Sequence, residues 1–484
     1  MYTFTTGIVL LVLGYLFYSR FVAGVIGISP DRKSPALRMA DGVDYVPMPT
    51  WKVFMIQFLN IAGLGPIFGA ISGAAFGPVA YLWIVFGNIF MGAVHDMCVG
   101  VLSMRNDGAN LPTLVGRHLG SRMKIVMALL TIGLLLAIAG SFIGGPADLL
   151  SIQTGWSKML WVCIIFGYYV LAAIVSIDKI IGKIYPLFGA FLLFMALAVG
   201  IMMFHYAFCG DVTIPELTSE TFHNYHWNPK ANPIFPMMFI IISCGALSGF
   251  HATQSPLMAR CLKNEKYARQ IFYGSMICEG IVAMIWATAA MTYLGGPEAL
   301  NEAMASGVTP AMLVDRICRS WIGKLGGLLA IVGVILCPIT SGDTALRSMR
   351  LTVAELLKVD QRKVFKRILV SIPVFAAAFA LCMLDFNIIW KMMGIFNQTL
   401  SMVILWAMAE ALKQRSKHTW ILSIPATFIS FICILYYLSS PHEAGGMAIN
   451  YSWSCAIAAF LTLCLDYLFY TDKISEIRNL ENRK

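Results

Sequence analysis

Charged residues are scarce in this chain. Asp, Glu, Lys and Arg make up only 12% of its 484 residues, against roughly 25% in a soluble domain, and 58% of the residues are hydrophobic. A chain of this composition cannot form a water-soluble surface, so it is a polytopic membrane protein. Its net charge of +10 does not indicate nucleic-acid binding, because the basic residues are confined to short loops between apolar runs.

Signals of several other protein classes are also missing. No CxxC pair occurs among the twelve cysteines, so neither a zinc site nor a redox motif is indicated. Cys209 and Cys318 lie in loops on the same predicted side; free thiols are the favoured interpretation and a disulfide is the alternative. The first apolar run, residues 3–28, lacks a basic segment and a cleavage site, so we expect a retained helix rather than a signal peptide.

Long apolar runs are abundant. A run of about 20 apolar residues can span a bilayer as a helix. About thirteen such runs are present, at residues 3–28, 53–76, 79–104, 124–146, 159–177, 184–208, 236–256, 270–294, 322–343, 367–384, 390–411, 420–438 and 451–470. One side of this arrangement carries 28 of the 35 Lys and Arg residues and the other carries six, which predicts an N-terminus outside and a cytoplasmic C-terminus.

Three loop positions carry helix-start signals. Asn110 is expected to cap a short helix at residues 111–118. In the outer loop, Pro297 follows Gly296 at the start of one helix, and Thr309 is expected to cap another. The loop 295–321 is therefore predicted to form a helical hairpin that could act as a lid.

The second apolar run is interrupted at its centre. Gly63, Gly65 and Pro66 fall within four positions there. Glycine costs about 1 kcal/mol and proline about 3 kcal/mol relative to alanine in a helix. Because freed backbone groups must find partners in lipid, we expect this break to face a cavity and bind a ligand.

A second break is predicted at residues 243–251, where Gly245 and Gly249 lie four apart. Close helix packing through small residues is the alternative explanation. The two interrupted helices lie five helices apart and run in opposite directions, as an inverted five-plus-five repeat requires. The predicted organisation is then an extra helix and cytoplasmic loop (1–52), a first repeat (53–208), an extracytoplasmic loop (209–235), a second repeat (236–411) and two extra helices with a cytoplasmic tail (412–484).

This all-α arrangement resembles the leucine-transporter-like fold of the amino acid–polyamine–organocation superfamily. The resemblance implies discontinuous first and sixth core helices with substrate bound between them. The predicted substrate-binding residues come from both breaks: Asn60, Gly63, Gly65, Pro66, Ile67, Phe68, Ser243, Gly245, Ser248 and His251. The half-helix that starts at Pro66 offers backbone donors at Ile67 and Phe68, which suit a carboxylate.

Local motifs distributed along most of the chain make a closer resemblance. They are Asp41-Gly42-Val43-Asp44-Tyr45-Val46-Pro47, Ile61 to Pro66, Gly92-Ala93-Val94-His95-Asp96, Ser103 to Gly108, Cys244 to Ala252, Asp343 with Arg347 and Arg350, and Gly394 to Gln398. In this respect the chain resembles the carbon starvation protein A family of bacterial inner-membrane transporters. The resemblance implies uptake of short peptides during carbon starvation; related members carry pyruvate with protons.

Ionisable residues inside spans are costly and indicate function. Thr340, Ser341, Asp343 and Thr344 offer hard oxygen ligands that could bind sodium, or Asp343 could carry a proton. The resembled fold places a cation site between this helix and the first core helix. The alternative is an interfacial Asp343 paired with Arg347, one turn on.

His95, Asp96 and Glu279 are candidate proton carriers, and His251 a candidate proton or substrate ligand. Adjacent residues on a helix point about 100° apart, so His95 and Asp96 are not expected to share one partner. Hydrogen-bonded packing is the alternative for each group. Of the intramembrane amides, Asn88, Asn397 and Gln398 are expected to cross-link helices, and Asn60 is the best candidate to face the cavity.

These patterns favour a secondary active transporter rather than an enzyme. It would take up a carboxylate-bearing nutrient, short peptides first and pyruvate or another small organic acid or amino acid second, with no cofactor beyond a coupling H+ or Na+. A passive channel is a more distant alternative, as is a membrane-embedded metalloenzyme, for which no HExxH motif is present. The expected partners are the substrate and the lipid bilayer of a bacterial inner membrane; the oligomeric state is left open.

Overall fold

The structure is a computed structural model that describes residues 1–174, 177–331, 333, 335, 337–361, 363–383 and 386–482. Within these ranges the regular structure is helical, and extended pairing is limited to two isolated bridges, Lys33 with Asn264 and Met48 with Leu262. The α-helices are α1 (Tyr2–Leu13), α2 (Ser19–Ile26), α3 (Pro35–Arg38), α4 (Thr50–Ala62), α5 (Ala70–Gly73), α6 (Ala80–Leu82), α7 (Ala93–Arg105), α8 (Leu111–Leu119), α9 (Ser121–Thr154), α10 (Lys158–Ile174), α11 (Ile177–Cys209), α12 (Phe239–Ile241), α13 (Gly249–Ala259), α14 (Gly274–Leu294), α15 (Pro297–Ala305), α16 (Pro310–Ile322), α17 (Lys324–Ile331), α18 (Cys337–Leu356), α19 (Val364–Leu381), α20 (Phe386–Lys413), α21 (Trp420–Ser439), α22 (Tyr451–Tyr470) and α23 (Lys473–Asn482).

Wider π-helical turns join several of these helices into longer rods. They are η1 (Gly14–Tyr18), η2 (Gly65–Gly69), η4 (Trp83–Gly92), η5 (Ile234–Met238) and η7 (Arg269–Tyr273), and short 3-10 turns occur at η3 (Ala74–Phe76), η6 (Glu265–Tyr267) and η9 (His442–Ala444). Such turns widen the helix locally and are frequent at functional sites. Two of them, η2 and η4, adjoin the breaks described below.

Eight helices among the described residues are long and apolar enough to cross a membrane, or nine if the bent pair Thr50–Ala62 and Gly65–Phe76 is one span. These nine coincide with nine of the thirteen predicted runs. The runs at 159–177, 236–256, 322–343 and 367–384 are not among them. The chain is thus an all-helical, multi-pass membrane protein, and the count of thirteen spans stays a prediction.

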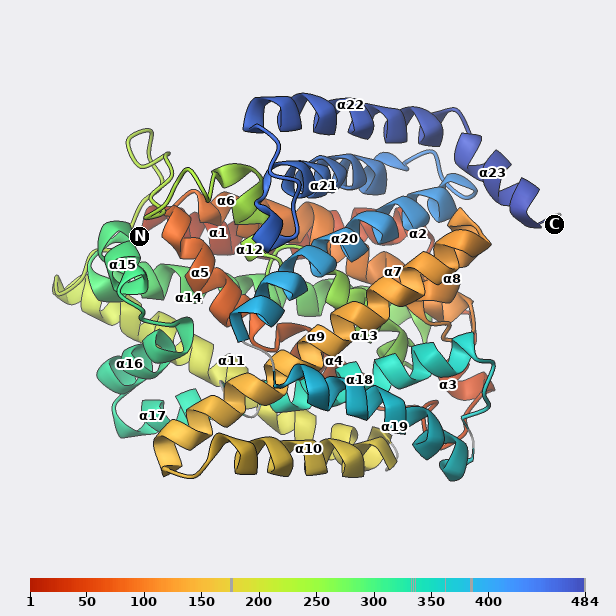
Figure 1. The fold of residues 1–484 in the computed structure, drawn as a ribbon, viewed down its shortest axis with the longest axis horizontal. Helices are drawn as coiled ribbons and strands as arrows, with labels where there is room; N and C mark the ends of the chain where they lie inside the picture. Colours follow the sequence, from red (N-terminus) through yellow and green to blue (C-terminus); the bar gives the residue numbers. More distant parts are fainter. Residues whose placement is uncertain are drawn as a thin grey trace.

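The helices form layers around a buried centre (Figure 1). Helices α21 and α22 lie along one edge and α10 with α19 along the opposite edge, while α4, α7, α13, α14 and α20 fill the middle. The central helices are more buried than those at the edge. In the most apolar stretch of Ala80–Arg105, 83% of the residues are buried, against 22% in Tyr451–Tyr470. A helix that is apolar all round and buried belongs to the interior of a bundle, so the central helices are where polar residues need partners.

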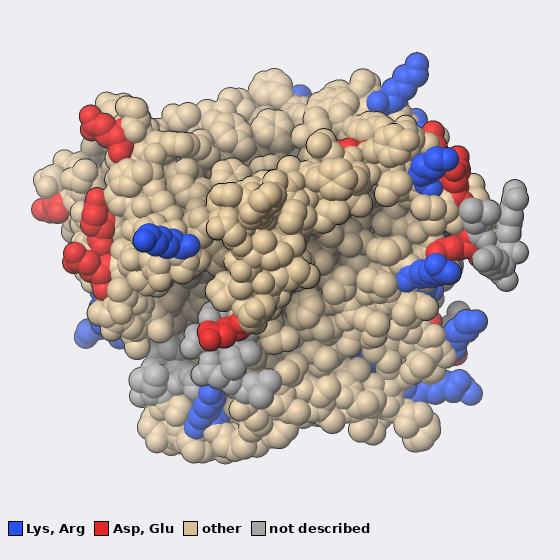
Figure 2. Space-filling view, turned by 45° about the horizontal axis from the view of Figure 1, so that its top comes forward, with Lys and Arg blue, Asp and Glu red and all other residues tan. Residues whose placement is uncertain are grey.

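Charge is segregated between the two ends of the molecule. Lys and Arg gather at the end where α3, α8 and α23 lie, and several Asp and Glu at the opposite end (Figure 2). The assignment of the basic end to the cytoplasm stays a prediction.

The loop predictions have mixed outcomes. Helix α15 follows Gly296 as expected, and the side chain of Thr309 accepts a hydrogen bond from Met312 N at 3.3 Å as the N-cap of α16. Asn110 occupies the N-cap position of α8, but the predicted side-chain cap is wrong, because its Oδ1 accepts from Arg260 Nη2 at 2.9 Å instead. Cys209 and Cys318 are free thiols, as favoured.

Candidate functional site

The first break is short. Helix α4 ends at Ala62, Gly63 and Leu64 lie between the two helical segments, and the chain restarts at Gly65, bent by 48°. Gly63 has φ +30° and ψ −130°, a conformation that residues with a Cβ rarely adopt. The predicted interruption at Gly63, Gly65 and Pro66 therefore exists, and one glycine makes the turn.

Asn60 lies one turn before this break and is fully buried. Among the described residues, neither its Oδ1 nor its Nδ2 has a hydrogen-bond partner. A buried amide left unpaired costs about 1–3 kcal/mol, so such a group needs a reason. A bound ligand that pairs with the amide would supply one.

The backbone donors predicted at Ile67 and Phe68 already have an acceptor. Both N–H groups point to the carbonyl oxygen of Leu64, at 3.3 Å and 2.8 Å. These are the i→i−3 and i→i−4 bonds of a first helical turn that starts at Leu64. The expectation that they are free to receive a carboxylate is thus wrong for this conformation.

The second break is longer and is held by side chains from other helices. Seven residues, 242–248, separate α12 from α13. Trp83 Nε1 donates to the carbonyl of Ile242 at 2.8 Å, and Asn88 Nδ2 donates to the carbonyl of Gly245 at 2.8 Å. The freed carbonyl groups therefore find partners on the η4–α7 helix, as backbone groups in an apolar interior must.

Helix α20 holds the same segment from the other side. Asn397 donates through Nδ2 to Ser243 Oγ at 3.1 Å and accepts at Oδ1 from Ser248 Oγ at 3.0 Å and from Phe250 N at 2.7 Å. Gln398 Nε2 donates to the carbonyls of Phe239 and Leu247 at 2.9 and 3.1 Å. The prediction that Asn88, Asn397 and Gln398 cross-link helices is confirmed.

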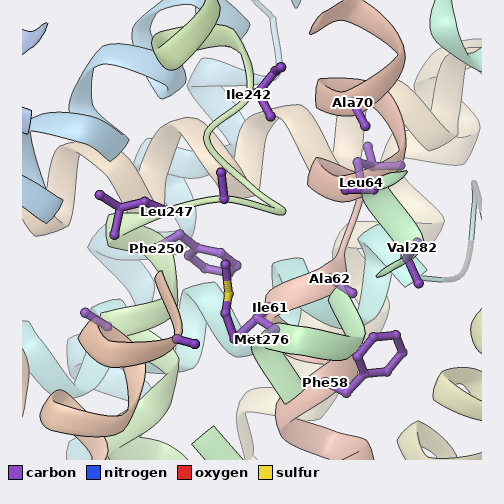
Figure 3. Packing of buried hydrophobic residues seen from close by; sticks show 14 of the residues in the cluster. Phe58, Ile61, Ala62, Leu64, Ala70, Ile242, Leu247, Phe250, Met276 and Val282 are labelled. Atoms are coloured by element: carbon purple, nitrogen blue, oxygen red, sulfur yellow. The ribbon is translucent and has the colours of Figure 1, made fainter. Parts of the chain in front are cut away.

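The two breaks lie against each other. A Cβ added to Gly65 would lie 2.1 Å from Cys244 Cβ, and one added to Gly245 would lie 3.9 Å from Pro66 Cα. Figure 3 shows the two segments in one view, with Leu64 of the first break on one side, Ile242 and Leu247 of the second on the other, and Phe250 beside Met276. The site that the sequence assigned to both breaks is therefore one continuous region.

Four ionisable residues meet beside the second break. His95 Nδ1 lies 2.8 Å from Asp96 Oδ1, Asp96 Oδ2 lies 3.1 Å from His251 Nδ1, and His251 Nε2 lies 3.5 Å from Glu279 Oε2. Glu279 Oε1 accepts from the backbone N–H of Gly245 at 3.0 Å. All four side chains are 0% exposed. The separate sequence candidates thus form one chain that runs from α7 through α13 to α14.

His251 lies at the centre of this chain, between two carboxylates. Each ring nitrogen of His251 faces a carboxylate oxygen, and an imidazole donates to both only when it is protonated. His95 and Asp96 bond to each other, and only Asp96 reaches α13. A proton on His251 could move toward Asp96 or toward Glu279 with no charged group entering lipid.

Three residues at this position could together bind a metal ion. Ligand atoms of Cys244, His251 and Glu279 lie within 4.8 Å of one another, and thiolate, imidazole and carboxylate are the usual ligands of zinc. Cys244 was not among the sequence candidates, because a lone cysteine in an apolar run carries no motif.

The oxygen-rich stretch of α18 adjoins the first break. Ser341 Oγ donates to the carbonyl of Leu59 at 3.2 Å and lies 3.3 Å from where a Cβ on Gly63 would be. Thr340 and Thr344 donate to carbonyls of their own helix. Ser341 thus connects α18 to α4 beside the first break, and its role as a cation ligand stays a prediction.

Asp343 points to another helix. Tyr185 of α11 places its hydroxyl 2.6 Å from Asp343 Oδ2 and 3.0 Å from the carbonyl of Thr340. Sequence reasoning missed Tyr185, since a tyrosine in an apolar run gives no signal of its partner. Arg347, the alternative partner considered for Asp343, donates to the carbonyl of Ala172 at 2.9 Å.

A buried ion-pair cluster joins the loop before α4 to two arginines of α18. Asp44 Oδ1 lies 3.5 Å from Arg347 Nη1 and 3.4 Å from Arg350 Nη2. Burial opposes the charge on Asp44, but the two guanidinium groups outweigh it and hold the pKa of this carboxyl below its ordinary value. The loop that precedes α4 is thereby fixed to α18.

Comparisons with known proteins agree with this architecture. The family described as carbon starvation protein CstA matches residues 1–151 and 146–324. An uncharacterized membrane protein of Haemophilus influenzae is 40% identical over 345 residues, which cover 62% of this chain and 93% of that protein.

Two relatives in Escherichia coli have functional names. Peptide transporter CstA is 26% identical over 561 residues, covering 87% of this chain and 78% of that protein. Pyruvate/proton symporter BtsT is 27% identical over 347 residues, covering 57% of this chain and 47% of that protein. The similarity is to transporters rather than to enzymes.

Proposed function

This chain belongs to the carbon starvation protein CstA family, a family of membrane transporters, and we propose that it takes up short carboxylate-bearing peptides by proton-coupled alternating access. The single observation that carries the coupling is the buried chain His95–Asp96–His251–Glu279 beside the second break. Buried ionisable groups in a span are costly, and proton relays are a common reason for keeping them.

The substrate in this proposal lies between the two breaks. The unpaired amide of Asn60 offers two N–H donors and one oxygen acceptor. Its donors suit a carboxylate, and its donors and acceptor together suit a peptide group. Ser248 is the N-cap of the helix that carries His251, and its Oγ lies 3.6 Å from Sγ of Cys244, the residue that meets Gly65. Proton binding at His251 and substrate binding at Asn60 would then be coupled through the contact between Gly65 and Cys244.

We also propose a specific architecture for this chain. The two interrupted helices would be the first and sixth of an inverted five-plus-five repeat, within about thirteen spans and with the N-terminus outside. Inverted repeats place substrate at the midplane, between discontinuous helices whose exposed backbone lines the cavity.

Uptake into proteoliposomes tests the proposal. Purified protein would be assayed with labelled dialanine and labelled pyruvate, with the inward proton gradient and sodium varied separately. We expect dialanine uptake that requires the proton gradient and not sodium. Glu279→Gln should abolish gradient-driven uptake, while Glu298→Gln, on the exposed helix α15, should leave it intact. Sodium-driven uptake, or equal uptake by the Glu279→Gln variant, would contradict proton coupling at this cluster.

Pyruvate is the second candidate, supported by the similarity to a pyruvate/proton symporter. Uptake of pyruvate, but not of dialanine, driven by the proton gradient would identify pyruvate as the substrate. Counterflow separates a carrier from a channel, because only a carrier accumulates label against preloaded substrate. Sodium dependence that Ser341→Ala removes would instead assign coupling to α18, where Ser341 meets the first break.

A further inference from the structure

A polar pocket of about 410 Å³ opens at the basic end of the molecule, far along α7 from the break region. It lies where the loop after α2, the end of α7 and the residues after α20 meet. Its charged lining residues are Arg32, Lys33, Arg38, Arg105, Arg415 and Glu265. Five cationic side chains therefore face one carboxylate.

Part of this positive charge is already neutralised. Arg105 Nη2 lies 2.5 Å from Glu265 Oε1, and Arg38 Nη2 lies 2.7 Å from Asp107 Oδ1. Arg32 is 3.9 Å from Glu265, which Arg105 holds more closely.

The side chains of Lys33 and Arg415 have no hydrogen bond or ion pair with any residue that the structure describes. Burial and the neighbouring charges of Arg105 and Arg32 lower the pKa of Arg415, and the opposing effect of Glu265 does not cancel them. An unbalanced positive pocket remains.

A buried hydroxyl also faces this space. Ser34 lines the pocket, is 2% exposed, and its Oγ has no hydrogen-bond partner among the described residues. It sits before the four-residue helix α3 but makes no capping bond. A buried hydroxyl without a partner costs free energy that a ligand oxygen would recover.

We propose that this pocket binds a phosphate group. Arginine and lysine with a hydroxyl donor form a typical phosphate-binding set, with charge-assisted bonds to several oxygens at once. The volume lies in the range of small-molecule sites. The phosphate is either the headgroup of an anionic phospholipid, since the pocket lies where α2, α7 and α20 end, or a soluble phosphate ligand.

Binding to delipidated full-length protein in neutral detergent tests the inference, with two probes. One arm titrates inorganic phosphate against matched sodium chloride, and the other titrates short-chain phosphatidylglycerol against phosphatidylcholine. Affinity is read from the shift of the unfolding temperature and from adducts in native mass spectrometry. The variant is Lys33→Gln/Arg415→Gln. Its control is Lys263→Gln/Lys417→Gln, which removes two exposed charges outside the pocket.

We expect the pocket variant to lose about tenfold or more in affinity for at least one probe, since each Lys or Arg near an anionic lipid contributes about 1 kcal/mol. Ser34→Ala should lose roughly threefold, as one hydrogen bond predicts. Phosphatidylglycerol alone would identify a lipid headgroup, and phosphate alone a soluble ligand. Equal binding by wild type and the pocket variant in both arms, or an equal loss in the control variant, would overturn the proposal.

Discussion

The two breaks face the same problem, unpaired backbone in an apolar interior, in different ways. The first spans two residues and turns at Gly63, with the amide of Asn60 left unpaired beside it. The second spans seven residues, and side chains from η4, α14 and α20 bond to it, among them Asn88 and Asn397.

The difference separates two roles. A segment bonded by several helices has one low-energy arrangement, because each alternative leaves buried polar groups unsatisfied. A segment that turns at one glycine, with an unpaired amide beside it, can form new hydrogen bonds without breaking existing ones. The second break is therefore the fixed part of the site, and the first is the part expected to respond to substrate.

The largest expected change in the free energy of unfolding comes from the ionisable cluster beside the second break. Asp96→Ala leaves His95 and His251 without their shared carboxylate, and breaking a buried pair in this way costs about 3–5 kcal/mol. The free energy of unfolding in detergent, followed by tryptophan fluorescence, should fall by that amount. Asp315→Ala removes an exposed carboxylate paired with Arg319 and should change it by less than about 1 kcal/mol. Equal shifts would show that the cluster does not stabilise the break.

The next largest change in stability is expected where the two breaks are in contact. Gly65→Ala would bring its Cβ within 2.1 Å of Cys244 Cβ and should destabilise by about 1–3 kcal/mol through overpacking. Cys244→Gly in the same chain should restore part of the loss. Gly167→Ala, which meets no atom within 4 Å, serves as the control and should be neutral or slightly stabilising. Failure of the double variant to recover would mean that the breaks are not in contact.

Two asparagines should respond with opposite signs. Asn60→Leu removes an unpaired buried amide and should raise stability by about 1 kcal/mol while uptake is lost, whereas Asn397→Leu should lower stability by at least that amount. Thermal unfolding and proteoliposome uptake of each variant would be measured together. A stabilised Asn60→Leu variant with normal uptake would remove Asn60 from the substrate site.

The smallest effect lies outside both breaks and provides a pH reference. Burial opposes the charge on Glu216, but the N-terminal ammonium and Thr3 lower its pKa to about 2. Its stabilisation is therefore complete well above the unfolded pKa of about 4.3, and it is lost progressively as the pH falls from about 4.3 through about 2. Glu216→Gln should lower stability by less than about 1 kcal/mol, equally at pH 7 and pH 5. A difference between these two pH values would contradict this assignment.

Much of the site could be read from the sequence because its determinants are local. Glycine and proline mark the breaks whatever their surroundings, and ionisable residues such as His251 and Glu279 stand out in apolar runs. Partners could not be read, because they depend on how neighbouring helices are rotated and tilted. Thus the bond from Tyr185 to Asp343 was missed. Composition also does not show that the Ile67 N–H already bonds to the carbonyl of Leu64, three residues earlier. The binding and coupling roles themselves stay predictions.

The amide of Gln398 has a mechanical consequence. Its Nε2 bonds to the carbonyl of Phe239 before the second break and to that of Leu247 near its end. The neighbouring Asn397 accepts from the N–H of Phe250 in α13. Helix α20 thus ties α12, the break and α13 together, and these segments should move as one rigid body. Conformational exchange must then displace α4 relative to this body. Spin labels on α20 and α13 should keep a constant separation during turnover, while the separation between α4 and α20 changes.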